Sequence, residues 1–318
     1  MNTIVQGFAR SATLTLILTS LLWATSVADA ADPPIRALLF KPWINGVLRD
    51  EPQMQVQRYD DDTYVIRQSI RTNFEGPFLY VLFGSDRALL IDTGAGGLKV
   101  RPTIDRVIAE WATRHHRTSI PLVVSHSHSH GDHHQGDAEF QDRPDTTIVG
   151  LYPKDIADFF KIADWPNQIV SYDLGGRVLD IIPTPGHQSA HIMMFDRKTR
   201  LLFSGDSLGP YRLYIPMNEA KTYRDSIDRV AAFTSDKHVS WILGAHIEMT
   251  TKPRELIPDE APSHPDEHVL EISCSNLPEL QTALHAMGDN LIQQAHRDFV
   301  IFPRPAREPQ PFAPPPPQ

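Results

Sequence analysis

The chain has 318 residues, of which 41% are hydrophobic and 22% are charged. These values are typical of soluble globular proteins, and they exclude a disordered, collagen-like or disulfide-stapled chain. The formal net charge of -9 argues against a nucleic-acid partner, because proteins that bind polyanions usually carry a basic excess. The unusual feature of the composition is its 15 histidines, many of which lie within residues 125–134.

The first 30 residues predict a secretory signal peptide. Arg10 precedes an apolar run over residues 12–24, and the small residues Ala28-Asp29-Ala30 follow. The run is shorter than the roughly 18 apolar residues of a membrane span, so we expect cleavage after Ala30 and no stable membrane insertion afterwards. The mature protein is then expected to be periplasmic or secreted. Cys274 is the only cysteine, so an internal disulfide is excluded even in that oxidising setting.

Hydrophobic periodicity along the rest of the chain predicts an α/β (α+β) fold. Short apolar runs between turn residues predict strands at 64–66, 78–83, 88–91, 121–125, 146–149, 178–182, 191–195, 201–203 and 239–243. Apolar residues at helical spacing predict helices at 99–114, 153–162, 223–233 and 279–299. Because the strands come in runs with helices between them, we expect sheets covered by helices.

We expect one domain over residues 31–302 that ends with the C-terminal helix. That helix, 279–299, would bury the apolar residues Leu280, Leu284, Met287, Leu291 and Ile292. Residues 303–318 are so rich in proline that they predict a disordered tail.

A dense group of metal-binding residue types follows the apolar strand at 121–124. The segment reads Ser125-His126-Ser127-His128-Ser129-His130-Gly131-Asp132-His133-His134. Imidazole nitrogens and carboxylate oxygens suit zinc and similar divalent ions. An H-x-H-x-D-H spacing fits one frame only, which is His128, His130, Asp132 and His133. A passive histidine run needs neither the interleaved aspartate nor the strand before it, so the segment favours a built metal site.

Three further candidate ligands lie after later strands. His187 follows Pro183-Thr184-Pro185-Gly186, Asp206 follows the strand ending in Ser204-Gly205, and His246 follows Gly244-Ala245. His191 starts a strand and favours a structural hydrogen bond instead. His126 and His134 flank the motif without filling a ligand position.

These motifs, together with Ile91-Asp92-Thr93-Gly94, resemble the metallo-β-lactamase superfamily from about Tyr64 to His246. The resemblance implies a four-layer αββα sandwich with its site at one edge of the paired sheets. It implies that His128, His130 and His187 hold one metal, that Asp132, His133 and His246 hold a second, and that Asp206 bridges them. Asp92 would orient a metal ligand through a hydrogen bond, or simply cap a turn.

The expected cofactors are two divalent ions, with zinc as the default and iron or manganese as alternatives. Two such ions that share a water lower its pKa toward neutrality and provide a bridging hydroxide nucleophile. Asp132 would act as the catalytic residue by orienting that water and then carrying a proton to the leaving group.

Asp206 favours a glyoxalase II-like or lactonase-like hydrolase of a thioester, ester or lactone bond, because the resemblance places Cys or Ser there in true β-lactamases. The alternatives are a β-lactamase and a non-catalytic metal-binding module. We expect a small-molecule substrate, and we make no prediction of the oligomeric state. Tyr211, Tyr214 and Lys221, with Arg212 and Arg224 nearby, lie between Asp206 and His246, where a loop would contact an acidic substrate. A solvated surface is the alternative for these residues.

Overall fold

The computed structural model describes Met1 and residues 39–306. The predicted signal peptide, apart from Met1, lies outside the described residues and stays a prediction. Within the described residues the strands form three sheets, of which two are six-stranded and one is three-stranded. No helix in this part of the chain has both the length and the apolarity that crossing a membrane requires.

The first sheet has the strand order β1-β2-β3-β4-β5-β6. Its strands are β1 (Met54–Asp60), β2 (Thr63–Gln68), β3 (Phe78–Phe83), β4 (Ala88–Ile91), β5 (Leu122–Ser125) and β6 (Thr146–Ile148). Strands β1 to β4 are antiparallel, whereas β4, β5 and β6 run parallel. The predicted strands at 64–66, 78–83, 88–91, 121–125 and 146–149 are thereby confirmed, and β1 is an addition.

The second sheet has the order β13-β12-β10-β9-β8-β7. Its strands are β7 (Val170–Asp173), β8 (Val178–Pro183), β9 (Ile192–Asp196), β10 (Leu201–Gly205), β12 (Trp241–Gly244) and β13 (Glu271–Ile272). Strands β10 and β12 are parallel, so both point their carboxyl ends toward the same edge. The predicted strands at 178–182, 191–195, 201–203 and 239–243 are confirmed.

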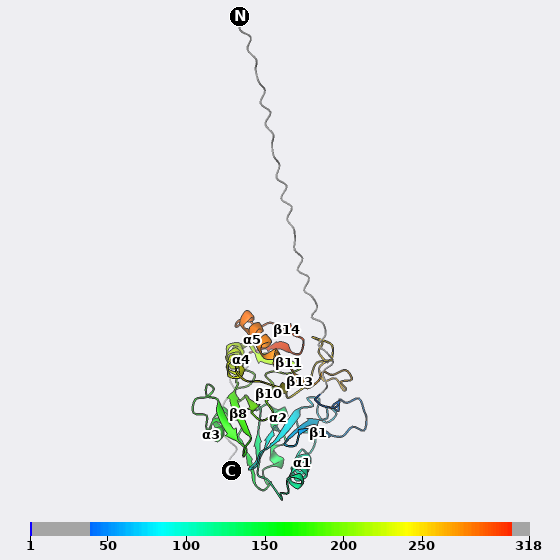
Figure 1. Cartoon of the computed structure of the whole chain (residues 1–318). Helices are drawn as coiled ribbons and strands as arrows, with labels where there is room; N and C mark the ends of the chain where they lie inside the picture. The colour runs from blue at the N-terminus through cyan, green and yellow to red at the C-terminus, as the bar shows by residue number, and fades with distance from the viewer. Residues whose placement is uncertain (2–38, 307–318) are drawn as a thin grey trace. The chain divides into compact units, whose positions relative to one another are not determined.

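The two large sheets pack face to face with helices on their outer faces, which confirms the predicted αββα sandwich. Phe78, Tyr80 and Leu82 of β3 pack against the second sheet, while Leu79 and Val81 face helix α1 (Arg101–Arg114). A strand that is buried on both faces reads as a continuous apolar run, as β3 does. Helices α4 (Ala220–Thr234) and α5 (Asn276–Met287) lie side by side on the outer face of the second sheet (Figure 1).

The remaining helices are short. They are α2 (Gly131–His134), α3 (Pro153–Phe160) and the 3₁₀ turns at Asp137–Glu139 and Met217–Glu219.

The third sheet corrects the prediction for the C-terminal region. Its order is β11-β15-β14, with β11 (Arg212–Pro216), β14 (Gln294–Ala295) and β15 (Val300–Arg304). The predicted helix over 279–299 is wrong beyond Met287, because Gly288 takes a φ of 62° and ends α5. Leu291 is buried, but Ile292 is 63% exposed.

The predicted disordered tail also begins too early, because Pro303 and Arg304 belong to β15. Pro303 pairs with Ile215 of β11, and β14 on the other side reaches only as far as Ile301. A proline is tolerated there because its missing N–H falls where the strand has a neighbour on one side only. The residues from 307 onward lie outside the described part of the chain.

A buried arginine ties the two large sheets together. Arg177 donates to the backbone oxygen of Asp62 at 2.6 Å and to Thr63 Oγ1 at 2.7 Å, and it pairs with Asp196 Oδ2 at 2.7 Å. The Arg177 and Asp196 side chains are 2% and 0% exposed, so neither charge has water as a substitute partner.

Replacing Arg177 with methionine is expected to lower the free energy of unfolding by about 3–5 kcal/mol, because Asp196 then stays buried as an unpaired charge. Urea-induced unfolding measures the change. The matched control is Arg106→Gln, which removes a half-exposed pair with Glu110 and should cost less than about 1 kcal/mol. Equal losses in the two variants would contradict this account of Arg177.

Candidate metal centre

The candidate ligands meet because parallel strands of both sheets end at one edge. Gly205 of β10 pairs with Gly244 of β12, which brings Asp206 and His246 side by side. From the first sheet, β5 leads directly into the histidine segment. Backbone hydrogen bonds join the two sheets here, from Ile192 N to Ser127 O and from Phe78 N to Ala245 O, each 2.8 Å long.

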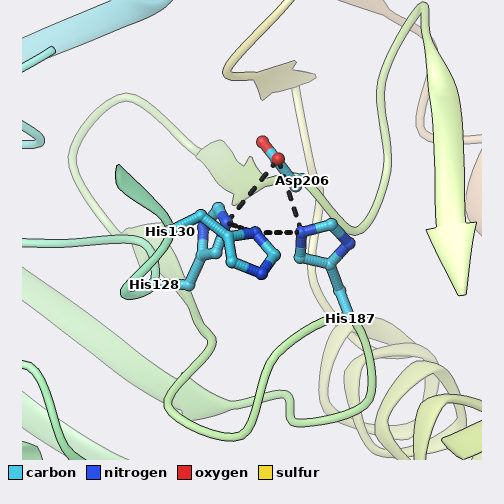
Figure 2. A group of neighbouring side chains, drawn as sticks. All are labelled: His128, His130, His187 and Asp206. Carbon is cyan, nitrogen blue, oxygen red and sulfur yellow. Dashed lines mark hydrogen bonds and ion pairs between the residues drawn. The ribbon is translucent and has the colours of Figure 1, made fainter. Parts of the chain in front are cut away.

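The first cluster consists of His128, His130, His187 and Asp206, which point toward one another (Figure 2). His130 Nδ1 lies 2.8 Å from His128 Nε2 and 3.0 Å from His187 Nε2. Asp206 Oδ2 lies 3.6 Å from His128 Nε2 and 3.5 Å from His187 Nε2. The four donor atoms therefore surround one point.

The second cluster consists of Asp132, His133, His246 and the same Asp206. His133 Nε2 lies 3.0 Å from Asp132 Oδ2 and 3.5 Å from Asp206 Oδ1. His246 Nε2 lies 3.2 Å from Asp132 Oδ2 and 3.4 Å from Asp206 Oδ1. Asp206 thus presents one carboxylate oxygen to each cluster.

The donor set fits divalent cations. Ligand atoms arranged tetrahedrally around zinc lie about 3.3 Å from one another, and the measured separations bracket that value. Asp206 Oδ1 is buried and accepts no hydrogen bond from the described residues. A buried carboxylate oxygen without a hydrogen bond is costly, and a cation between the ligands would satisfy it.

Hydrogen bonds behind the ligands orient their rings. His133 Nδ1 lies 2.9 Å from Asp92 Oδ2, whose carboxylate also accepts bonds from the N–H and hydroxyl of Ser127. His187 Nδ1 bonds to the backbone oxygen of Tyr214 at 2.8 Å, and His246 Nδ1 bonds to that of Glu75 at 2.9 Å. Each contact occupies Nδ1 and turns Nε2 toward the cluster, an arrangement that raises ligand basicity.

The charges of the cluster keep its carboxylates ionised. Burial raises the pKa of Asp206, but the charges of His133 and His246 outweigh it and hold that pKa well below the ordinary value. The same two histidines lower the pKa of Asp132 against the effect of burial. Burial and the neighbouring imidazoles lower the pKa of His128 well below its ordinary value. The centre therefore offers anionic oxygens and, at His128, a neutral imidazole. Against the effect of burial, the neighbouring carboxylates raise the pKa of His133 well above its ordinary value and that of His246 to about 10, so a metal ion would displace a proton from these two rings.

Other histidines of the region make contacts of a different kind. His191 Nδ1 lies 2.7 Å from Thr184 Oγ1, and its Nε2 accepts the backbone N–H of Asp206 at 3.2 Å. His126 Nε2 lies 2.9 Å from Asp137 Oδ1. These hydrogen bonds stabilise the loops that carry the ligands, and the two rings belong to neither cluster.

A pocket of about 210 Å³ opens over the two clusters. Tyr211 and Tyr214 line it, and their contact with a substrate stays a prediction. Tyr211 donates its hydroxyl hydrogen to the backbone oxygen of Gly205 at 2.5 Å. The prediction for Lys221 is wrong, because this side chain lies outside the pocket, is 71% exposed and pairs with Asp225 on α4. The expected substrate-contacting loop is also wrong for residues 212–216, which form β11.

The pocket also contains side chains that sequence reasoning did not assign to the site. They are Glu75, Glu248 and Arg304. Arg304 fell in the predicted tail, and its only sequence signal was the short apolar run Phe299-Val300-Ile301-Phe302 before it.

Comparison with known proteins identifies relatives of the site region. Residues 73–239 match the family model described as the metallo-beta-lactamase superfamily. The chain is 32% identical over 138 residues to the hydroxyacylglutathione hydrolase of Rhizobium meliloti (strain 1021), covering 40% of this chain and 52% of that protein. It is 24% identical over 201 residues to the acyl-coenzyme A thioesterase MBLAC2 of Bos taurus, covering 53% and 72%.

The fold has solved counterparts. The structure of TMB-1 superposes with a TM-score of 0.51 at 13% identity, covering 74% of this chain and 99% of that one. The alignment with the Rhizobium protein spans only about half of that protein's length. His246 and Arg304 both lie beyond the residues that match the family model.

Proposed function

Because the chain belongs to the metallo-β-lactamase superfamily, we propose that it is a binuclear metal-dependent hydrolase that cleaves a thioester, ester or lactone bond. The observation that carries this proposal is Asp206, whose two oxygens face separate clusters. The two relatives, a hydroxyacylglutathione hydrolase and an acyl-coenzyme A thioesterase, favour a thioester among the three bonds.

Two divalent ions, with zinc as the first candidate, would supply Lewis acidity and a water of lowered pKa when bound. His128, His130 and His187 would hold one ion, Asp132, His133 and His246 the other, and Asp206 both. Hydrolysis forms a carbon–oxygen bond from water to the acyl carbon, breaks the carbon–sulfur bond and delivers a proton to the departing thiolate.

In this proposal Asp132 handles that proton. Its carboxylate is part of the pocket wall, and its Oδ2 lies within 3.2 Å of both His133 Nε2 and His246 Nε2. It therefore lies where it can accept a hydrogen bond from the attacking water and then pass the proton to the leaving sulfur.

The test is a hydrolysis panel with matched metal analysis of the purified protein. The substrates are S-lactoylglutathione, a homoserine lactone, an aryl ester and a chromogenic β-lactam. We expect about two metal ions per chain by the two-metal model and turnover of the thioester. Turnover of the lactam alone would favour a β-lactamase, and a folded chain without metal would refute the proposal.

Replacing Asp92 with asparagine is expected to weaken metal affinity by about 10- to 100-fold, because His133 loses the charged partner of its Nδ1. Asparagine is the suitable substitute, since it tolerates the φ of 67° at this position. Competition with a chromophoric chelator measures the affinity. Asp86→Asn, at an exposed turn, is the control, and unchanged affinity in Asp92→Asn would contradict the supporting role.

A further inference from the structure

The C-terminal strand β15 supplies one wall of the pocket over the metal centre. It pairs in parallel with β11, so that Tyr214 lies opposite Phe302 and Pro216 opposite Arg304. Leu213, Ile215 and Ile301 are buried with the residues of α4 and α5. Because side chains alternate along a strand, Tyr214, Phe302 and Arg304 share the opposite face, which is the face toward the pocket.

The Arg304 guanidinium is held by aromatic rings. Its Cζ lies 4.2 Å from the ring centroid of Tyr214 and 5.4 Å from that of Phe302. A guanidinium that stacks through its face keeps its N–H edge available for a planar anion. Among residues 39–306, no carboxylate lies close enough to the Arg304 guanidinium, within 4 Å, to form an ion pair with it.

The other arginine of the pocket is already engaged. Arg212 lies 3.3 Å from Glu248 Oε2 and 3.9 Å from Asp259 Oδ1, and it donates to the backbone oxygen of Ile257 at 2.7 Å. A substrate anion would have to displace these partners to reach Arg212. Arg304 is therefore the cation of the pocket wall that is positioned to bind one.

Tyr214 connects Arg304 to the candidate ligand His187. Tyr214, on which the guanidinium stacks, accepts the hydrogen bond of His187 Nδ1 through its backbone oxygen. The pocket volume of about 210 Å³ is smaller than the 300–1,000 Å³ of typical ligand sites. A large thioester does not fit within this volume, so part of it must lie at the mouth, where Arg304 is exposed. With the acyl carbon at the metal centre, a bulky thiol is the part that would extend to the mouth.

We propose that Arg304 forms an anion-binding subsite that recognises a carboxylate or phosphate on the leaving-group side of the substrate. This rests on the proposed function and narrows it to thioesters of an acidic thiol. Two parallel N–H donors of a guanidinium match both anions, and such charge-assisted pairs are stronger than neutral hydrogen bonds. The subsite selects substrates, and the metal centre acts on the bond itself.

The experiment compares three lactoyl thioesters with one acyl group and different thiols, in the full chain with metals bound. The thiols are glutathione, which carries carboxylates, coenzyme A, which carries phosphates, and neutral N-acetylcysteamine. The variants are Arg304→Gln and Arg304→Lys, with Arg106→Gln on α1 as the control. Metal content and thermal unfolding are measured for each variant.

We expect Arg304→Gln to lower the ratio of kcat/KM for a charged thioester to that for the neutral one by about 10-fold or more, mainly through KM. Arg304→Lys should recover part of the ratio, because it keeps the charge and loses the planar pair of donors. A loss confined to the glutathione thioester identifies a carboxylate site, and a loss confined to the coenzyme A thioester identifies a phosphate site.

The inference is overturned if the wild-type protein hydrolyses these thioesters and the ratio is the same in Arg304→Gln. It is also overturned if the control lowers the ratio equally. The proposed function fails separately, and a metal-loaded wild-type protein that hydrolyses none of these thioesters and no ester or lactone of the panel would show that failure.

Discussion

Replacing Asp206 with alanine is expected to lower both metal content and kcat/KM, the latter by more than about 100-fold. The loss of a residue that only supports a ligand costs about 10- to 100-fold, and Asp206 offers donor atoms to both clusters. Its removal also leaves Asp132 as the one cluster carboxylate near the Nε2 atoms of His133 and His246, which lie 3.5 Å apart.

Metal analysis and steady-state kinetics with the thioester test this prediction. Asp225→Ala, an exposed position on α4, is the matched control, because it removes an aspartate that forms an exposed ion pair with Lys221. An Asp206→Ala protein with about two metal ions and wild-type turnover would show that the clusters do not share this ligand.

Replacing Asp132 with asparagine is expected to reduce kcat by about 10²- to 10⁴-fold, the range typical of a lost general acid–base group. The amide oxygen remains able to contact a metal, so metal content should fall much less than turnover. The amide cannot accept the proton of the attacking water and release it to the leaving thiolate, so protonation of the leaving group is the step that slows.

A second substrate sharpens this prediction. A lactoyl thioester of an aryl thiol has a better leaving group and depends less on protonation, so the variant should lose less activity on it than on an alkyl thioester. Full activity of Asp132→Asn on the alkyl thioester would exclude the role of Asp132 in proton transfer.

Much of the fold could be predicted because its strands carry strong local signals. The runs at 78–83 and 88–91 are apolar throughout, since β3 and β4 are buried on both faces. Strands with partly exposed alternation, such as β1 and β7, were missed because their hydrophobic pattern is weaker.

The clusters at the metal centre bring together residues whose types and order were already visible. His128, His130, Asp132 and His133 lie within six residues directly after a strand, so local chain geometry keeps them near one another. His187, Asp206 and His246 each follow a strand of the second sheet, and the carboxyl ends of β10 and β12 coincide. The prediction for Lys221 was wrong because closeness to Asp206 in sequence does not determine which side of a helix a residue occupies.

The sequence by itself determined that helices cover the sheets and which residues are candidate ligands, because apolar strands and the residues after them are encoded locally. The four-layer sandwich followed from the resemblance to the superfamily. Only the tertiary structure decided what surrounds those ligands. Strand β15 pairs with β11 across more than eighty residues of chain, and Gly288 ends a helix that the apolar spacing alone would continue. Such long-range pairing carries little local signal, so the place of Arg304 beside the metal centre emerged from the packed structure alone.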